Sequence, residues 1–148
     1  MKEMNITDMK KENEASCVLR VGKVQEFDAE KHMSRVKFPD IDIVSHWLPV
    51  IAMNSLNVQD THYLDKDEHV VCIMNGTGTE SGYVLGAIYD AKNEPEDKNC
   101  DVRQVKFSDD TVISYDRQEH RLMIDVKGDI DMTASGNIKL TAGRIDLN

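Results

Sequence analysis

Between residue 17 and about residue 92, apolar residues either alternate with polar ones or form short runs, without a helical period. This pattern predicts β-strands. The five expected strands cover residues 17–27, 34–38, 47–51, 69–74 and 82–89. A bulge is expected at Gly22, and turn signals stand at Pro39–Asp40 and at residues 75–78. Five short strands in one small segment favour a barrel of the OB type over residues 17–92.

Four aromatic residues of this segment are the candidates for the core of the barrel or for an interface. They are Phe27, Phe38, Trp47 and Tyr89. In OB barrels such rings can also form a stacking platform for single-stranded nucleic acid. Here few Lys or Arg residues accompany them, which favours the core or interface interpretation.

The last 21 residues contain an internal repeat. Glycines head three units of near-equal length, at Gly128, Gly136 and Gly143. Within each unit two apolar residues stand two positions apart, so their side chains are expected on one face of a strand. The expected apolar positions are Ile130, Met132, Ile138, Leu140, Ile145 and Leu147. Two further strands are expected just before the repeat, over residues 111–115 and 121–126.

These short strands cannot cover their own apolar face, and the barrel needs its apolar residues for itself. Association with copies of the same chain would bury the stripe and pair the open strand edges. A single-chain solenoid and an intertwined prism of three chains both fit. Strands of four to six residues broken by glycine favour the prism, with the six apolar positions as its core and the three glycines at its turns. The expected architecture is therefore all-β, an OB barrel followed by a homotrimeric β-helix over residues 105–148.

The remaining segments are polar. Residues 1–16 are interpreted as an N-terminal tail, and residues 93–104 as a charged linker. The start of the chain lacks the apolar core of a secretory signal, and no run reaches the length of a membrane span, so we expect synthesis in the cytoplasm. The formal net charge of −9 is spread along the chain. Nucleic acid is therefore a poor candidate partner.

No motif predicts a catalytic or metal site, and no cofactor is expected. The three cysteines form no CxxC pair, and the five histidines form no HxH pair that would group imidazole ligands around a metal ion. Asp109, Asp110 and Asp116 are interpreted as turn residues rather than calcium ligands. A hydrolase using aspartates of the repeat is the least favoured function, and an OB-type module that binds nucleic acid or glycan is the main alternative to a structural role.

Several motifs stand in an order that resembles a known family. They are Val21-Gly-Lys-Val24, Arg35-Val-Lys-Phe-Pro-Asp40, Ser45-His-Trp-Leu-Pro-Val50, Lys66-Asp-Glu-His-Val70, Gly82-Tyr-Val-Leu-Gly-Ala-Ile-Tyr89 and Phe107-Ser-Asp-Asp-Thr-Val-Ile-Ser-Tyr-Asp116. Followed by the glycine-headed repeat, they resemble the baseplate assembly protein V family of phage spikes, and the corresponding spikes of phage-tail-like bacteriocins and type VI secretion. Asp110 stands where that family usually has glycine.

The resemblance implies a location and a mechanism. Three copies would sit at the tip of a contractile tail, in a virion or a tail-like particle. The barrels and the N-terminal tail would contact the hub protein, and the shaft would point at the target cell envelope. The tip would be closed by Leu147 and Asn148 packing on their copies, or by a PAAR-like tip protein. The spike would pierce the envelope mechanically when the sheath contracts.

Overall fold

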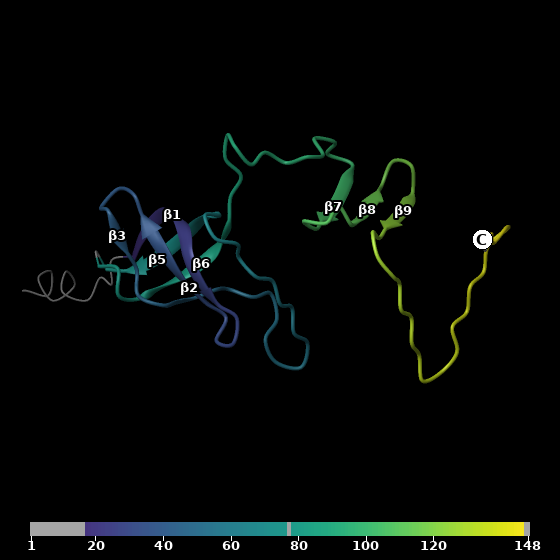
Figure 1. Cartoon of the computed structure of the whole chain (residues 1–148), viewed down its shortest axis with the longest axis horizontal. Helices are drawn as coiled ribbons and strands as arrows, with labels where there is room; N and C mark the ends of the chain where they lie inside the picture. The colour runs from purple at the N-terminus through teal and green to yellow at the C-terminus, as the bar shows by residue number, and fades with distance from the viewer. Residues whose placement is uncertain (1–16, 77, 147–148) are drawn as a thin grey trace, which may run out of the picture. The chain divides into compact units, whose positions relative to one another are not determined.

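The computed structural model describes residues 17–76 and 78–146, and all its regular elements are strands (Figure 1). No helix occurs among these residues, so the all-β expectation is confirmed. The chain divides into two compact units between Glu94 and Pro95. We call them the N-terminal unit and the C-terminal unit. The expected N-terminal tail, residues 1–16, lies outside the described residues.

The N-terminal unit is one antiparallel sheet built around a long central strand. Its strands are β1 (Cys17–Asp28), β2 (Met33–Phe38), β3 (Ile43–Val44), β4 (Leu48–Pro49), β5 (His69–Asn75) and β6 (Gly82–Ala87). The order across the sheet is β3-β2-β1-β5-β6, and β4 also pairs with β2. The 12-residue β1 therefore serves two neighbours, β2 along its second half and β5 along its first.

The two edges of this sheet meet just after β4. Val50 forms a parallel bridge with Val84 on β6, and the Ile51 amide donates to the Val84 carbonyl at 3.0 Å. The sheet thus curls until its edges touch, which encloses a single core. The buried apolar residues of that core are Val24, Val36, Phe38, Leu48, Val50, Leu64, Val70, Cys72, Met74 and Val84.

Details of β1 correct the sequence interpretation. The bulge lies between Val24 and Glu26, where the register with β2 shifts, and not at Gly22. Gly22 is instead a position of close packing. A Cβ there would stand 2.7 Å from the Lys37 carbonyl oxygen and 2.9 Å from a ring carbon of Phe38, and it would overlap Val36. Glycine is required at this position by space rather than by a bulge.

The expected strand over residues 47–51 is shorter than predicted, since β4 comprises only Leu48 and Pro49. The loop between β4 and β5 is long, and Figure 1 shows it projecting from the sheet. The strands expected over 17–27, 34–38, 69–74 and 82–89 correspond to β1, β2, β5 and β6 with small differences at their ends. The two-residue β3 was not predicted.

The C-terminal unit contains a three-stranded antiparallel sheet in the order β7-β8-β9. Its strands are β7 (Val102–Lys106), β8 (Val112–Asp116) and β9 (Arg121–Asp125). The strands expected over 111–115 and 121–126 are therefore present. The expected linker is too long at its end, because β7 begins at Val102 and takes in residues 102–104.

After β9 the described residues form no further strand, up to residue 146. In Figure 1 this segment runs as a single trace that bends once, with no strand of its own unit beside it. The three strands expected in the repeat are thus absent from its described residues, 128–146. A β-strand is defined by a hydrogen-bonded neighbour, and the single chain provides none here.

Candidate functional site

The most prominent surface of the C-terminal unit is an uncovered apolar face of its sheet. Val105, Ile113 and Ile124 are paired side by side across β7, β8 and β9. Their exposed fractions are 52%, 41% and 55%. Tyr115 and Leu122 form the next pair on the same face and are also exposed. An antiparallel sheet normally buries one such face against a core, and this one has no covering layer among the described residues of its unit.

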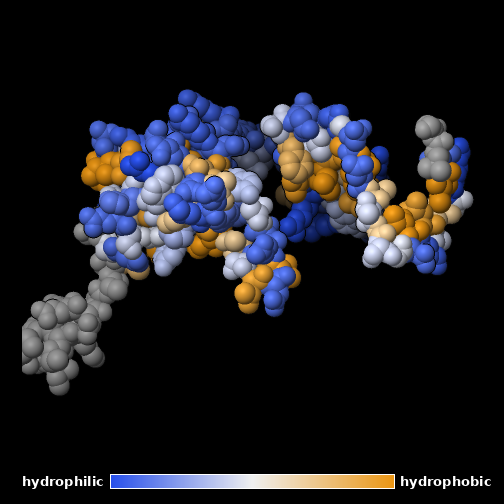
Figure 2. Space-filling model, turned by 60° about the horizontal axis from the view of Figure 1, so that its bottom comes forward, coloured by the Kyte–Doolittle hydropathy of each residue, from blue (hydrophilic) through white to orange (hydrophobic). Residues whose placement is uncertain are grey.

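Exposed apolar residues also occur in the glycine-headed repeat. The repeat residues predicted to form a shaft core all have half or more of their surface exposed: Ile130, Met132, Ile138, Leu140 and Ile145. Figure 2 shows hydrophobic residues gathered on the C-terminal unit. The remaining predicted core residue, Leu147, and the predicted tip residue Asn148 lie outside the described residues. Exposed apolar surface on this scale marks an interaction site in soluble proteins.

The glycines of the repeat have no steric explanation within one chain. A Cβ added at Gly128, Gly136 or Gly143 would meet nothing within 4 Å. This differs from Gly22, whose surroundings leave no room for a side chain. Their predicted role as turns of a shaft therefore depends on contacts that the single chain does not contain.

A small polar network fixes the point where the sheet passes into the repeat. The Asp109 carboxylate accepts hydrogen bonds from the Thr111 amide at 2.9 Å and from the Thr111 hydroxyl at 3.1 Å. The Thr111 hydroxyl oxygen accepts the Lys127 amide at 3.1 Å. Thr111 is buried, with 9% of its surface exposed. The hydrogen bond from the Thr111 amide is the main cause that lowers the pKa of Asp109.

The neighbouring turn carries an unusual backbone conformation. Asp110 has a φ of 66°, in the left-handed region that glycine adopts most easily and that Asp tolerates better than most residues. Its amide donates to the Phe107 carbonyl at 3.1 Å, and its carboxylate lies 3.0 Å from Lys106 Nζ. Asp109 and Asp110 are thus engaged within the turn, as their interpretation as turn residues requires.

The four aromatic candidates of the N-terminal unit divide into two pairs. Phe38 is fully buried in the core, and Phe27 packs against it while only partly buried. Trp47 is 40% exposed and Tyr89 is 71% exposed, so neither belongs to the core. The Arg35 guanidinium stands 6.0 Å from the centre of the Trp47 ring, within the range of a cation–π contact. Trp47 is therefore accompanied by an arginine, which its sequence neighbours did not indicate.

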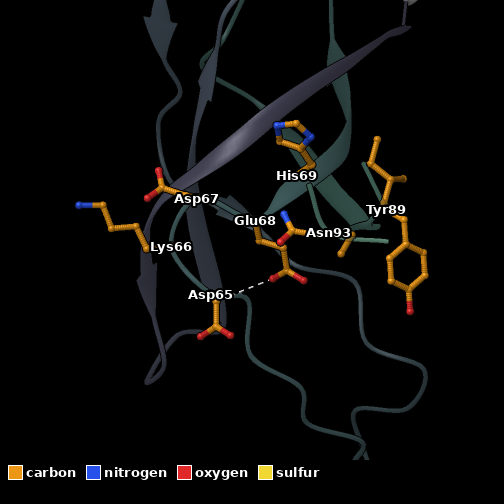
Figure 3. Close-up of a pocket in the computed structure, with 9 residues that line it drawn as sticks. Asp65, Lys66, Asp67, Glu68, His69, Tyr89 and Asn93 are labelled. Atoms are coloured by element: carbon orange, nitrogen blue, oxygen red, sulfur yellow. Dashed lines mark hydrogen bonds between the residues drawn. The ribbon is translucent and has the colours of Figure 1, made fainter. Parts of the chain in front are cut away.

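A pocket of the N-terminal unit lies beside the start of β5 and the end of β6 (Figure 3). The turn that lines it is held by the Asp65 amide, which donates to the Glu68 carboxylate at 2.9 Å. Nearby, His69 Nδ1 lies 2.8 Å from the Asp90 carboxylate. Hydrogen bonds from the Asn93 and Lys92 amides lower the pKa of Asp90. These contacts complete two turns, and a carboxyl with a lowered pKa is unsuited to act as a general acid near neutral pH.

No group of three or more potential metal ligands occurs among the described residues. The residues that the structure describes also include no helix long and apolar enough to cross a membrane. The cysteines remain separate thiols, with Cys17 and Cys100 exposed and Cys72 buried.

Sequence reasoning missed part of the apolar face. Val105 lies next to the segment interpreted as a linker, and neither it nor Ile113 was recognised as part of a surface. The available signal was the alternation of Val105 and Phe107 with charged and polar neighbours. Two alternating apolar residues, Val105 and Phe107, are too few to predict a strand by themselves. Comparison of the chain with models of known protein families and with curated proteins found no match.

Proposed function

We propose that this protein is a structural spike, which assembles as a homotrimer through its C-terminal unit and pierces a cell envelope without catalysis. The observation that carries the proposal is the apolar face of β7, β8 and β9 together with the exposed apolar positions of the repeat after it. Burying one Ile or Leu contributes roughly 1.5–3 kcal/mol, so three chains that bury these positions together gain a large driving force.

The trimer also explains the missing strands. Residues 126–146 form no strand in the single chain, yet they alternate apolar and polar residues. In an intertwined prism each of these segments would pair with a segment of another chain, and the apolar side chains would point to the axis. The repeat would then be a β-helix, stiff because every backbone group along it is paired. Stiffness and a narrow cross-section are the properties that a mechanical spike needs.

The strand connections of the N-terminal unit support an OB-type barrel as the other half of the spike. The strands occupy five positions along the chain. β1, β2, β5 and β6 each fill one position, and the short strands β3 and β4, which both pair with β2, together fill the third. The third position meets the last through the parallel bridge from Val50 to Val84, so the sheet closes as a five-stranded barrel would. Asp110 supports the resemblance as well, since it adopts the left-handed conformation at the position where the spike family usually has glycine.

Under this proposal the N-terminal barrel contacts the hub of a contractile tail or tail-like particle, and a separate PAAR-like protein can cap the tip. Neither contact requires a cofactor. The acidic balance of the chain, −9 overall, disfavours the alternative of a nucleic-acid-binding module.

A matched pair of variants tests the proposal. Leu140→Asp places one carboxylate per chain on the predicted shaft axis, whereas Asn137→Asp adds the same charge to the opposite face of the same repeat unit. Burial of three unpaired charges is strongly unfavourable, so the first variant is expected to lose the trimer and the second to keep it. The readouts are mass in solution and melting temperature. If Leu140→Asp kept the mass and melting temperature of the wild type, the proposed shaft would be wrong.

A further inference from the structure

The N-terminal unit has two exposed apolar surfaces that the barrel itself does not need. The first is the outer face of the β1-β5-β6 sheet. Leu19 pairs with Ile73, and Ile73 pairs with Tyr83. Val21 pairs with Val71 in the next row, and Val71 pairs with Gly86. Leu85 precedes Gly86 on β6, where the register between β5 and β6 shifts, and its side chain is exposed. The centre of the outer sheet face therefore carries six apolar side chains, of which Val71 and Ile73 are half-buried and the others exposed: Leu19, Val21, Val71, Ile73, Tyr83 and Leu85.

This face is exposed to an unusual degree for apolar residues in strands. Leu19 is 67% exposed, Val21 51% and Tyr83 47%. The solvent face of an antiparallel sheet normally alternates to polar residues, but none of these six central positions is polar. A contiguous block of this kind marks a surface that another molecule covers.

The second surface is the tip of the loop between β4 and β5, which we call the apolar finger (residues 53–58). Met53 and Leu56 are each 81% exposed, and Val58 is 66% exposed. In the space-filling view hydrophobic residues lie beside hydrophilic ones at the end of a projection from the N-terminal unit (Figure 2). Residues 50–59 contain no charged side chain, in a chain of which 30% is charged.

The finger is held in shape rather than left loose. Ser55 and Gln59 form an antiparallel bridge, and the Asp60 amide donates to the Asn54 carbonyl at 3.1 Å. At its base, the Tyr63 ring lies edge-on to Phe27 with 5.6 Å between the ring centres. A preorganised apolar projection can bind without first losing conformational entropy.

We propose that the apolar finger of one copy docks on the outer sheet face of the next copy, so that the three barrels form a closed ring. Both surfaces are exposed in the single chain, so the finger does not cover the face of its own barrel. The finger and the six central positions of the outer sheet face carry no charged side chain, whereas the whole chain has a formal net charge of −9. Copies of an acidic protein repel each other least where their surfaces are uncharged. A three-fold ring needs two different complementary patches on each copy, and the finger and the face are such a pair. The inference rests on the proposed trimer.

A chemical labelling experiment tests this contact in the assembled protein. Leu85→Cys places a reporter thiol on the outer sheet face, in a background in which Cys17→Ser and Cys100→Ser remove the exposed native thiols. Glu30→Cys in the same background is the control reporter, on an exposed turn away from the face. Each reporter is studied with three versions of the finger. The first is unchanged, and the second carries Leu56→Asp/Val58→Asp. The third carries Asn57→Asp, a control that adds charge without removing an apolar side chain.

We expect the thiol at position 85 to react about tenfold or more faster when Leu56→Asp/Val58→Asp is present, because the covering finger is then lost. The rate at position 30 should not change, and Asn57→Asp should have a smaller effect than the double variant. Equal rates at position 85 in protein with the mass of three chains would overturn the docking and leave the trimer intact, with the face free for another partner. A monomeric mass in every variant would overturn the proposed function and this contact with it.

Discussion

The backbone amide of Lys127 donates a hydrogen bond to the Thr111 hydroxyl oxygen, with 3.1 Å between the two atoms. The bond joins the start of β8 to the residue just before the glycine-headed repeat. The same hydroxyl donates to Asp109, so one buried threonine serves both sides of the junction. The sheet and the repeat are thereby fixed to each other at the point where the proposed shaft begins.

Thr111→Val should loosen this junction. Valine has the shape of threonine but cannot accept the Lys127 amide, and an unpaired partly buried amide costs about 1–3 kcal/mol. Hydrogen exchange at the Lys127 amide should therefore become faster, and the melting temperature should fall. Thr111→Ser keeps the hydroxyl and is the control. Unchanged exchange at Lys127 in Thr111→Val would show that the hydrogen bond does not hold the junction.

Asp109 should make this junction sensitive to acid. Its pKa is lowered in the folded protein, so its contribution to stability is complete above the ordinary value of 3.8 and is lost as the pH falls through the lower folded pKa. Asp109→Asn should therefore melt at a lower temperature than the wild type at pH 6. The difference should shrink below about pH 4. A difference that stayed constant down to pH 2.5 would contradict the assigned role of the carboxylate.

Gly22→Ala should destabilise the N-terminal unit. The added methyl group has no space between β1 and β2, and overpacking of this kind costs roughly 1–3 kcal/mol. Gly78→Ala is a suitable control, because the nearest atom to an added Cβ there is 4.0 Å away. Thermal unfolding of the two variants distinguishes them. Equal melting temperatures would mean that β2 can move aside to accept the methyl group.

The thiol of Cys72 should be inert in the folded protein. Burial raises its pKa to about 12 from an ordinary value of 9.0, while Cys17 and Cys100 are exposed. At pH 8 a thiol reagent should modify Cys17 and Cys100 quickly and reach Cys72 only after unfolding. Because the folded pKa is the higher one, this group favours folding fully below pH 9 and loses that contribution as the pH rises toward 12. Rapid labelling of Cys72 in native protein would contradict its place in the core.

The sequence predicted the positions of the strands in the N-terminal unit better than it predicted which face of each strand points into the core. In β1 the residues Leu19 and Val21 point outward, while Gly22 and Val24 are buried. Apolar residues occur on both faces of this strand, so alternation alone cannot identify the inner face. Glycine at position 22 has no side chain to mark burial, and its closeness to Val36 is visible only in three dimensions.

The C-terminal unit was predictable to a different degree. The glycine-headed repeat is plain in the sequence, and the apolar stripe it predicts is exposed in the chain. The strands predicted in the repeat could not be tested in one chain, because under the trimer proposal they would pair with strands of other copies. Val102 and Val105 were missed as part of a strand because Arg103 and Gln104 separate them within a charged segment. Local sequence shows a strand poorly when cross-strand pairing, here with β8, determines it.

The most direct test of the central claim is the mass of the purified protein in solution, measured by light scattering over a range of concentrations. We predict three times the 16.8 kDa of one chain, with no dissociation on dilution. An intertwined shaft that buries the apolar positions of three repeats should not come apart without unfolding. A stable, folded monomer of 16.8 kDa would contradict the account, because the exposed apolar face would then have no copy of the chain to cover it.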